Sequence, residues 1–472
     1  MTEGKCRNAF SLCLYAQYST TRLLFRVKKK VYLMKEKYRK SDYIHLVYRK
    51  ESSDYLMYSF RTRRFIVLNE LQKFLFDNAP YDELDSPFLQ SLYDHGFLVD
   101  FDEYEALKKR QKERQEEDRA IHLGIVPTMD CNFQCDYCIE TNQVRGGRMS
   151  EEVQKQVVTF AKGLLQDADS FSPVWFGGEP MLYMKPIVSI GKELKQYCDE
   201  RHIPLWGTIY TNGYFLTPEN IRLLEEAGVR TVRISVDGSR ESHDRMRHLP
   251  DGSGSYDRIL SNLSVPTSMT YRIRCNMNRK NLGDYEILVH TLKEIAKKSG
   301  NRIIVSAERM RVEKDVNREL KAIELTYPEY YDFFQKVRDL TVDTDEERVL
   351  QLLRGKSTGV VCNAARKNSY QIDERGNIYK CNWFLGKDDH VIGNVADHPS
   401  REELNSTKEA RYFMERRMTD REKCRKCRML PVCLGRCPLS WEEKDRYDCV
   451  RDLNNLDALL PKAYEAYLHM FC

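Results

Sequence analysis

The chain has 472 residues, of which 41% are hydrophobic and 31% are charged. This composition excludes disordered and collagen-like proteins and allows two or three hydrophobic cores. No apolar run approaches the roughly 20 residues that span a membrane, so we expect a soluble protein without a signal peptide. The net charge is +5, and the positive charge is concentrated in residues 1–50, which contain 13 Lys and Arg against 3 Asp and Glu.

Cysteine is unusually abundant, with fifteen residues. Three lie together at Cys131, Cys135 and Cys138, and seven more fall between Cys362 and Cys449. This uneven distribution indicates metal binding and not the disulfide scaffold of a secreted protein. The isolated cysteines are predicted to be small buried hydrophobic residues. They are Cys6, Cys13, Cys198, Cys275 and Cys472.

Residues 1–50 show no clear periodicity, whereas the next segment has an apolar stripe at helical spacing that ends at Pro80. The stripe consists of Ile66, Leu68, Leu71, Phe74 and Leu75. A second helix is expected around residues 88–93, followed by a turn at Gly96 and a short strand over 97–99. Helix, helix and strand in this order resemble a winged helix. Residues 102–119 mix both charge signs and predict a solvated linker helix that ends this domain.

From His122 to about Ala307, strand-like and helix-like runs alternate, which is typical of parallel βα units. Strands are predicted over 123–127, 173–176, 205–211, 231–236, 271–276 and 302–306. Helix starts are expected at Ser150 and Thr217, and a helix end just before Gly228. The predicted fold class is α/β, with a partial (β/α)6 TIM barrel open on one side. After about Arg354 the sequence becomes turn-rich and cysteine-rich, so metal is expected to stabilise that part.

The first cysteine group directly follows the first barrel strand, where barrel enzymes place their chemistry. Three thiolates on one tight loop can bind three irons of a four-iron cluster and leave the fourth iron open. A structural zinc site would need a fourth ligand nearby, and the next candidate, Cys198, is sixty residues away in a predicted helix.

The spacing Cys-x3-Cys-x2-Cys, with an aromatic residue before the last cysteine, resembles the radical S-adenosylmethionine (radical SAM) superfamily. Three further motifs of that superfamily follow in order: Phe176-Gly177-Gly178-Glu179-Pro180, Thr211-Asn212-Gly213, and Ile234-Ser235-Val236-Asp237-Gly238. The resemblance implies a [4Fe-4S] cluster on the three cysteines and S-adenosylmethionine (SAM) as cofactor. It also implies roles for individual side chains. Gly177, Gly178 and Glu179 would bind the methionine ammonium, Thr208 and Ser235 would line the ribose and methionine region, and Arg247 would meet the methionine carboxylate.

The second cysteine group resembles the seven-cysteine SPASM domain, which has two auxiliary [4Fe-4S] clusters. By this resemblance one cluster takes Cys424, Cys427, Cys433 and Cys449, and the other takes Cys362, Cys381 and Cys437. The second set is one ligand short, which implies an open iron or a ligand other than cysteine. The alternative is zinc, because Cys-x2-Cys-x5-Cys-x3-Cys could close a tetrahedral site alone.

Radical SAM enzymes cleave SAM reductively to a 5′-deoxyadenosyl radical, so the resemblance implies an oxidoreductase with three [4Fe-4S] clusters and an electron donor such as a ferredoxin or flavodoxin. Low-potential clusters require a reducing compartment, and we expect the cytoplasm. Proteins with a SPASM domain act mostly on peptides or proteins. The sequence therefore predicts a maturase of ribosomal peptides, similar to thioether-forming maturases of cysteine-rich (SCIFF) peptides, with a leader-bearing precursor peptide as partner.

Several alternatives stay open. A sulfatase-maturing enzyme that makes formylglycine typically has Asp directly after the second SPASM cysteine, whereas Asn382 follows Cys381 here. Carbon–carbon cyclophane formation and epimerisation are also compatible, and no general base is identified. A DNA-binding iron–sulfur sensor would not need Glu179, so nucleic acid is not expected as a partner. A membrane is not expected either, because no apolar run is long enough to span one. Domains are predicted at 1–118 (winged-helix-like peptide recognition and linker), 119–310 (barrel), 311–354 (helical connector) and 355–472 (SPASM).

Overall fold

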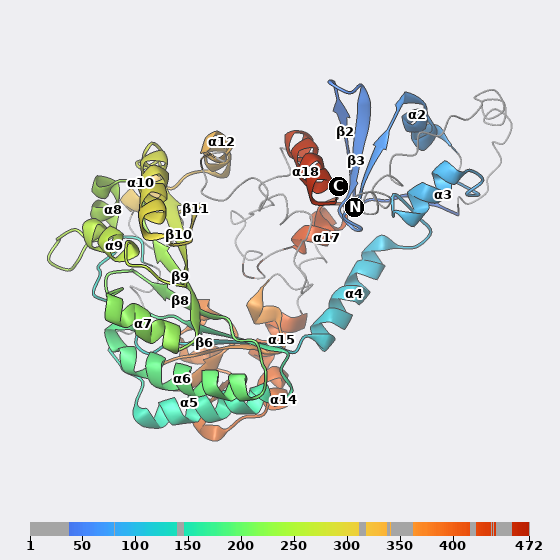
Figure 1. Ribbon diagram of the computed structural model, residues 1–472. Helices are drawn as coiled ribbons and strands as arrows, with labels where there is room; N and C mark the ends of the chain where they lie inside the picture. The colour runs from blue at the N-terminus through green and yellow to red at the C-terminus, as the bar shows by residue number, and fades with distance from the viewer. Residues whose placement is uncertain are drawn as a thin grey trace, which may run out of the picture. The chain divides into compact units, whose positions relative to one another are not determined.

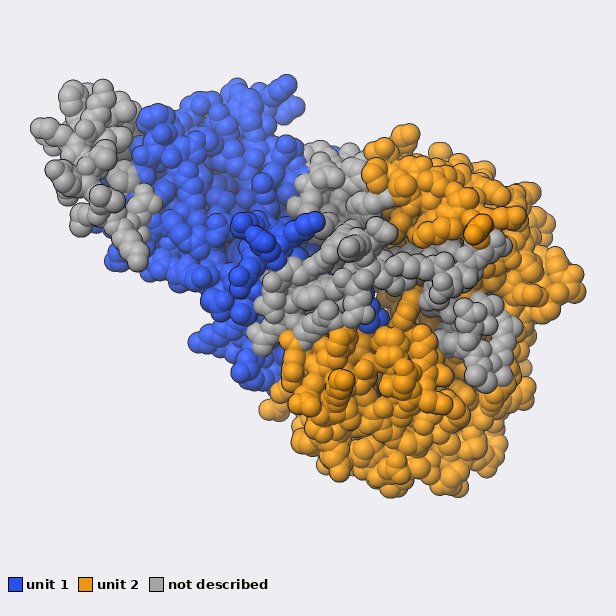
Figure 2. Space-filling view, turned by 180° about the vertical axis from the view of Figure 1, so that it is seen from behind, with its two compact units in different colours: residues 1–116, 345–361, 417–472 blue, residues 117–344, 362–416 orange. Residues whose placement is uncertain are grey.

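The computed structural model describes residues 37–79, 81–138, 146–310, 318–337, 340, 362–415, 422–435, 437, 439 and 456–471. The chain divides into two compact units (Figure 2). The barrel unit comprises residues 117–344 and 362–416, and the terminal unit comprises residues 1–116, 345–361 and 417–472. The terminal unit combines segments from both ends of the chain, whereas the boundaries drawn from the sequence divide the chain into consecutive segments.

The barrel unit is built on a nine-stranded sheet in the order β11-β10-β9-β8-β7-β6-β12-β13-β14. Its first six strands are mutually parallel. They are β6 (Ala120–Ile125), β7 (Ser170–Trp175), β8 (Gly207–Thr211), β9 (Val229–Ser235), β10 (Thr270–Met277) and β11 (Ile303–Arg309). Each of the six overlaps a strand predicted from the sequence, which confirms the α/β class and the parallel barrel sheet.

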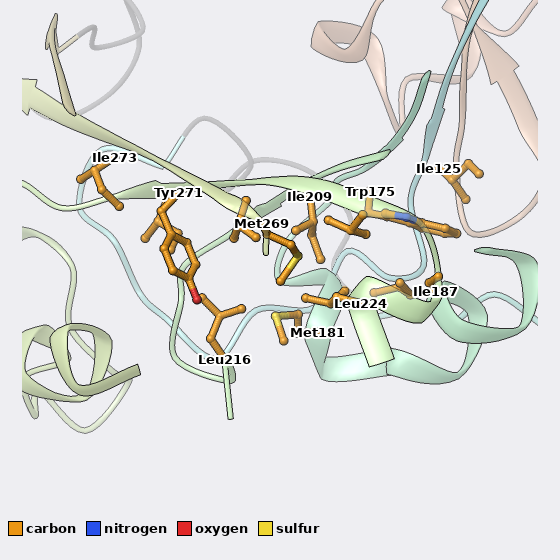
Figure 3. Packing of buried hydrophobic residues seen from close by; sticks show 14 of the residues in the cluster. Ile125, Trp175, Met181, Ile187, Ile209, Leu216, Leu224, Met269, Tyr271 and Ile273 are labelled. Carbon is orange, nitrogen blue, oxygen red and sulfur yellow. The ribbon is translucent and has the colours of Figure 1, made fainter. Parts of the chain in front are cut away.

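Helices cover one face of this sheet (Figure 1). They are α5 (Glu151–Leu164), α6 (Met184–Glu200), α7 (Pro218–Glu226), α8 (Arg240–Met246), α9 (Tyr256–Leu263) and α10 (Asp284–Ser299). The predicted caps are present: Ser150 accepts a hydrogen bond from the Val153 N–H, and Thr217 accepts one from the Asn220 N–H. Trp175 and Ile209 point from the strands toward Leu224 of α7 (Figure 3), within the main hydrophobic core. Cys198 and Cys275 are fully buried, as predicted.

The sequence did not predict that the sheet continues beyond β6. Strand β12 (Ser369–Ile372) pairs in parallel with β6, and Ser369 lies opposite His122. Strands β13 (Asn377–Tyr379) and β14 (Gly393–Asn394) then extend the sheet in antiparallel fashion. Residues 362–416, which were assigned to the SPASM domain, therefore share a sheet with the barrel.

Short helices complete the barrel unit. They are η1 (Leu165–Asp167), η2 (Pro180–Tyr183), α11 (Arg318–Ile323), α12 (Tyr327–Val337), η4 (Asn363–Ala365), η5 (Asn382–Phe384), η6 (Asp388–His390), η7 (Val395–Asp397), α14 (Arg401–Ser406) and α15 (Lys408–Glu415). No helix in the described ranges is long and apolar enough to cross a membrane.

The terminal unit contains an antiparallel sheet in the order β2-β3-β4 and a small pair of strands, β1 and β5. These strands are β1 (Arg39–Lys40), β2 (Ile44–Arg49), β3 (Asp54–Ser59), β4 (Phe65–Leu68) and β5 (Leu98–Val99). Its helices are α2 (Glu70–Asn78), α3 (Pro87–Asp94), α4 (Glu103–Glu117), α16 (Glu422–Arg425), α17 (Leu430–Cys433) and α18 (Leu456–Phe471). The two predicted helices, the short strand and the linker helix are all present.

One detail of that prediction was wrong. Ile66 and Leu68 belong to strand β4 and not to the helix, because Asn69 starts α2 through a reciprocal capping box with Gln72. The short strand predicted over 97–99 is β5, in which Leu98 is 1% exposed and pairs with Lys40 of β1. The strands at the two edges of the larger sheet are β2 and β4.

The two ends of the chain share one core in the terminal unit. Leu56 and Tyr58 of β3 cluster with Leu456 and Leu460 of α18 and with Met429. The partly buried Cys424 and Cys427 pack against the same cluster. The N-terminal sheet and the C-terminal cysteine segment are therefore stabilised together.

Candidate functional site

The first cysteine group lies on the loop that leaves the carboxyl end of β6, which we call the cluster loop (residues 126–138). The Cys138 N–H donates to the Cys135 carbonyl over 3.2 Å, which closes a tight turn between these cysteines. The Phe133 N–H donates to Cys131 Sγ over 3.4 Å, and Phe133 itself is 1% exposed in the core. The loop is thus anchored in the core by an aromatic side chain that lies between Cys131 and Cys135 in the sequence.

The electrostatics of these thiols fit a cluster ligand set. Burial raises the pKa of Cys131 and of Cys135, and the charges of the neighbouring cysteines raise both further. Three thiolates this close repel one another unless positive charge lies among them. Iron supplies that charge, and metal ligation requires the deprotonated form. The residues present therefore fit a cluster ligated by Cys131, Cys135 and Cys138.

Gly177 and Gly178 let the loop after β7 lie directly against the cluster loop. A Cβ at Gly177 would approach the Thr128 carbonyl oxygen to 2.4 Å, and one at Gly178 would approach the Asp130 carbonyl oxygen to 2.4 Å. Gly177 also has φ of +123°, which disfavours other residues. The two glycines therefore permit close packing of two backbones, a role in addition to the cofactor contact predicted from the sequence.

Glu179 is fully buried, and its carboxylate joins two loops. Oε1 accepts hydrogen bonds from the Met181 N–H at 3.0 Å and the Thr211 hydroxyl at 2.8 Å, and Oε2 accepts one from the Asn212 N–H at 2.6 Å. Burial nevertheless raises the pKa of Glu179 to about 7. These three donors show that Glu179 positions the two loops. Its contact with the methionine ammonium remains a prediction.

Asn212 connects the loop after β8 to the cluster loop. Its side-chain nitrogen donates to Asn132 Oδ1 over 2.8 Å, one residue after Cys131. The Asn132 side-chain nitrogen is buried and has no hydrogen-bond partner among the described residues. A buried donor without a partner is costly, so this nitrogen is suited to contact a ligand. The sequence motif indicated Asn212, but nothing in the sequence indicated Asn132.

A second polar network lies on the other side of the cluster loop. The Tyr137 hydroxyl donates to Asp237 and accepts hydrogen bonds from Asn276 Nδ2 and Arg247 Nη1, both at 2.9 Å. The Asn276 N–H also donates to Asp237 Oδ1 over 2.9 Å. This network joins the ends of β9 and β10 to the residue before Cys138. Asn276 was not predicted as a site residue, because no motif includes it.

Arg247 lies beside the cluster loop. The backbone of its neighbours pairs with the loop: the Gln134 N–H donates to the His248 carbonyl, and the Asp136 N–H donates to the Met246 carbonyl. Arg247 Nε is buried and has no hydrogen-bond partner among the described residues. The guanidinium therefore has a donor available for an anion, and contact with the methionine carboxylate remains a prediction.

Neutral His243 supports the segment that contains Arg247. Burial lowers the pKa of His243 well below its ordinary value, so the imidazole is neutral at pH 7. Its Nδ1 accepts from the Asp237 N–H over 3.2 Å, and its Nε2 lies 3.0 Å from the Ser255 hydroxyl. Ser255 in turn donates to the Arg247 carbonyl over 2.7 Å. This chain of hydrogen bonds fixes the backbone of Arg247 relative to that of Asp237.

Ser235 and Thr208, which were predicted to line the ribose and methionine region, lie at different positions along their strands. Ser235 is the last residue of β9, at the same edge as the cluster loop. Thr208 is only the second residue of β8 and pairs with Thr231, so it lies deeper along the strand than Thr211. Both roles remain predictions.

The second cysteine group is distributed over both units. Cys362 precedes η4 and Cys381 follows β13, both in the barrel unit, whereas Cys424, Cys427, Cys433 and Cys437 belong to the terminal unit. Cys449 lies outside the described residues. In the described part of the chain, no three His, Cys, Asp or Glu side chains converge as they would around a single metal ion. The two auxiliary ligand sets remain predictions.

Comparison with known proteins agrees with this fold and site. A family model of the radical SAM superfamily matches residues 125–264, which include the cluster loop, Glu179 and Arg247. The chain thus contains a radical SAM domain, as predicted from the sequence.

The chain is also similar to individual proteins. The cysteine-type anaerobic sulfatase-maturating enzyme of Clostridium perfringens (strain 13 / Type A) is 22% identical over 344 residues, which cover 70% of this chain and 91% of that enzyme. The AdoMet-dependent heme synthase of Methanosarcina barkeri (strain Fusaro / DSM 804) is 27% identical over 177 residues, which cover 36% of this chain and 46% of that enzyme. The solved structure of native anSMEcpe with bound AdoMet and Kp18Cys peptide has a TM-score of 0.57 at 19% identity, covers 75% of this chain and 99% of that chain, and shares the fold.

Proposed function

We propose that the protein is a maturase that modifies a ribosomally made precursor peptide by SAM-dependent radical chemistry. The main support is the combination of a complete cluster loop with similarity along almost the whole length of a sulfatase-maturating enzyme, which acts on a protein. The anSMEcpe structure with the same fold contains a bound peptide together with AdoMet. A peptide or protein is therefore the substrate class that the relatives favour.

In this proposal the residues of the barrel bind and orient the cofactors. Cys131, Cys135 and Cys138 would hold a [4Fe-4S] cluster, which when bound supplies the electron that cleaves SAM to methionine and a 5′-deoxyadenosyl radical. Glu179 would orient the ammonium end of SAM, and the Asn132 Nδ2 donor would contact an acceptor atom of the bound cofactor. Arg247 would hold the carboxylate end through its available Nε donor. The buried network around Tyr137 would keep these groups fixed while a substrate hydrogen atom is abstracted.

We propose two auxiliary [4Fe-4S] clusters on the second cysteine group. One set, Cys362, Cys381 and Cys437, is a ligand short, which favours an iron open to a precursor cysteine. Such a cluster would supply an electron acceptor for thioether formation, in which the thiol would lose its proton, its sulfur would bond to a substrate carbon radical, and one electron would be released. The missing ligand, and not the electron balance, favours intramolecular cysteine thioethers over carbon–carbon crosslinks.

Sulfatase maturation is the second candidate, and the similarity to the Clostridium perfringens enzyme favours it. Asn382 occupies the position after Cys381 where the resemblance would place an aspartate proton acceptor. Cys381 Sγ lies 3.9 Å from Asn382 Oδ1, and an amide cannot take up a proton at neutral pH. The additional N-terminal strands of the terminal unit are also unexplained by formylglycine formation.

We further propose that the terminal unit binds the leader of the precursor. An extended peptide can add to an open sheet edge through backbone hydrogen bonds, and β2 and β4 are the edge strands of that sheet. The electron donor would be a ferredoxin or flavodoxin, and the reducing conditions that such clusters need favour the cytoplasm.

The decisive experiment uses the full-length protein, reconstituted with iron and sulfide under anaerobic conditions. It is incubated with SAM, dithionite and the peptide encoded beside its gene, and the products are analysed by mass spectrometry. Thioether formation predicts the loss of two hydrogens per crosslink and of one alkylatable thiol. Formylglycine from cysteine instead loses the sulfur atom. Formation of 5′-deoxyadenosine without any change in a peptide would contradict the proposed function.

A further inference from the structure

The face of the barrel sheet opposite the helices displays a row of three arginines. Arg233 lies on β9, and Arg272 and Arg274 lie on β10. Arg272 is directly opposite Arg233 in the strand register, and Arg274 is opposite Ser235. Each arginine lies between core residues, such as Val232 and Ile234 beside Arg233. Because side chains alternate between faces along a strand, the three guanidinium groups point away from the helices. We call these residues the arginine row.

The arginine row is exposed and has no acidic counterpart. All three residues are exposed in the described structure. Strands β6 to β11 contain one acidic residue, Glu308, and none of the three arginines forms an ion pair with it or with any other described carboxylate. Arg233 instead packs over the ring of Tyr210, 5.3 Å from its centroid, and Tyr210 is 38% exposed. Like charges directly opposite each other on neighbouring strands destabilise a sheet, so this row gains stability from an anion.

The arginine row is also connected by hydrogen bonds to the cluster loop. Arg274 Nε donates to Asn276 Oδ1 over 2.7 Å, and Asn276 Nδ2 donates to the Tyr137 hydroxyl next to Cys138. An anion on the row would therefore lie on the face that ends at the cluster loop. Parallel sheets are normally covered on both faces, yet the described residues leave these arginines accessible.

We infer that the arginine row binds an acidic segment of the peptide substrate, which deepens the proposed function and rests on it. Neighbouring strands are about 4.8 Å apart, and residues two apart in a strand are separated by about 6.6 Å. Carboxylates at alternating positions of an extended peptide have the same spacing as Arg272 and Arg274. Guanidinium groups bind carboxylates with paired hydrogen bonds, which also fixes the orientation of the peptide. The row thus selects acidic residues near the carbon that loses hydrogen.

The test uses full-length reconstituted protein with SAM and a fluorescein-labelled peptide that has glutamates at alternating positions. The same peptide with glutamines is the matched ligand, and a single-stranded oligonucleotide of equal charge tests nucleic acid. The double variant Arg233→Gln/Arg272→Gln removes two charges from the row. Arg222→Gln/Arg240→Gln removes two charges from the helical side, where these arginines pair with Glu226 and Asp257, and is the control.

We expect the glutamate peptide to bind the wild type at least about tenfold more tightly than the glutamine peptide, with an affinity that falls as salt rises. The row variant should lose this preference, and the control variant should keep it. Equal binding of both peptides, tighter binding of the oligonucleotide through the same arginines, or an equal loss of SAM binding in the row variant would overturn the inference.

Two further measurements separate the possible explanations. If the wild type modifies the glutamine peptide as fast as the glutamate peptide, the inference fails while the proposed function stands. If the arginines bind the acidic peptide but mass spectrometry finds it unmodified, the proposed function fails instead. A last control replaces four acidic residues of the chain by the corresponding amides. They are Asp343, Asp345, Glu346 and Glu347. If this variant and the row variant both melted at a lower temperature than the wild type, the chain's own carboxylates would occupy the row, and the inference would be overturned.

Discussion

The carboxylate of Glu179 accepts a hydrogen bond from the Asn212 N–H over 2.6 Å, and it is fully buried where two strand-end loops meet. The Asn212 side chain continues the connection to Asn132 on the cluster loop. One acidic residue therefore fixes both the loop after β8 and, through Asn212, the loop that holds the cluster cysteines. Changes at Glu179 are expected to act on SAM binding even where the cluster itself remains intact.

Glu179→Gln should weaken SAM binding roughly ten- to hundredfold while the iron content stays unchanged. The amide nitrogen of glutamine cannot accept a hydrogen bond, so one of the present donors loses its partner. Isothermal titration with SAM and iron analysis of the same preparation measure the two quantities. Glu193→Gln, an exposed change on α6, is the control. Unchanged SAM affinity with reduced stability would assign Glu179 a structural role only.

The pKa of Glu179 predicts two opposite pH dependences. Burial raises this pKa from 4.5 to about 7, so the carboxyl of Glu179 binds its proton more tightly in the folded protein without SAM than in the unfolded chain. The contribution of protonated Glu179 to the free energy of unfolding is fully present below about pH 4.5. This contribution, about 3 kcal/mol, is lost as the pH rises through 7. An ammonium ligand prefers the ionised carboxylate, so SAM affinity should rise between pH 6 and pH 8. Both dependences should disappear in Glu179→Gln, and a pH-independent SAM affinity in the wild type would contradict the ammonium contact.

The parallel strands could be predicted because each is a short apolar run between helices with clear caps. Strand β12 could not, since Ser369, Tyr370, Gln371 and Ile372 show no distinctive pattern and join the sheet only by pairing with β6, about 250 residues away in sequence. Hydrophobic periodicity reports which face of a segment is apolar but not what covers it. For the same reason the packing of α18 with the N-terminal strands could not be predicted.

The site was predictable where a motif is local. The cluster loop and Glu179 each lie in a continuous motif, and the structure brings them together at one sheet edge. Asn276 and Asn132 were missed because their partners, Tyr137 and Asn212, are distant in sequence. The strand order and the paths of the loops at the strand ends bring such residues together, and both depend on the whole fold.

Anaerobic reconstitution should yield about twelve irons per chain, as three four-iron clusters. Replacing Cys131, Cys135 and Cys138 together by Ala should remove about four irons and abolish SAM cleavage, since the auxiliary ligands are distinct residues. Iron analysis and Mössbauer spectroscopy provide the count. Cys198→Ala is the control, because this cysteine is fully buried in α6 and should retain all the iron. A total of about four irons together with bound zinc would rule out the auxiliary clusters.

Glu103→Ala should destabilise the terminal unit by about 2 kcal/mol or more. Glu103 is 1% exposed at the start of α4, forms an ion pair with Arg61 at 2.9 Å and accepts hydrogen bonds from the Ser41 hydroxyl and the Asp42 N–H. Native-state hydrogen exchange of β1 and β5 measures the change. Glu105→Ala, an exposed change on the same helix, should alter exchange by no more than about 0.5 kcal/mol. Equal effects of the two substitutions would show that the buried carboxylate contributes little.

The last prediction is that the leader of the precursor adds a strand to the sheet of the terminal unit. Deleting residues 1–118 would not test this, because α18 would lose the strands that cover it. The intact enzyme should instead show slower hydrogen exchange in either β2 or β4 when the leader peptide is added, since a new strand pairs with backbone groups at an open edge. A peptide with the leader sequence shuffled is the matched control and should give neither this protection nor efficient modification of the attached core. If the shuffled leader protected the same strand equally, or if the core were modified equally fast with either leader, recognition of the leader by this sheet would be refuted.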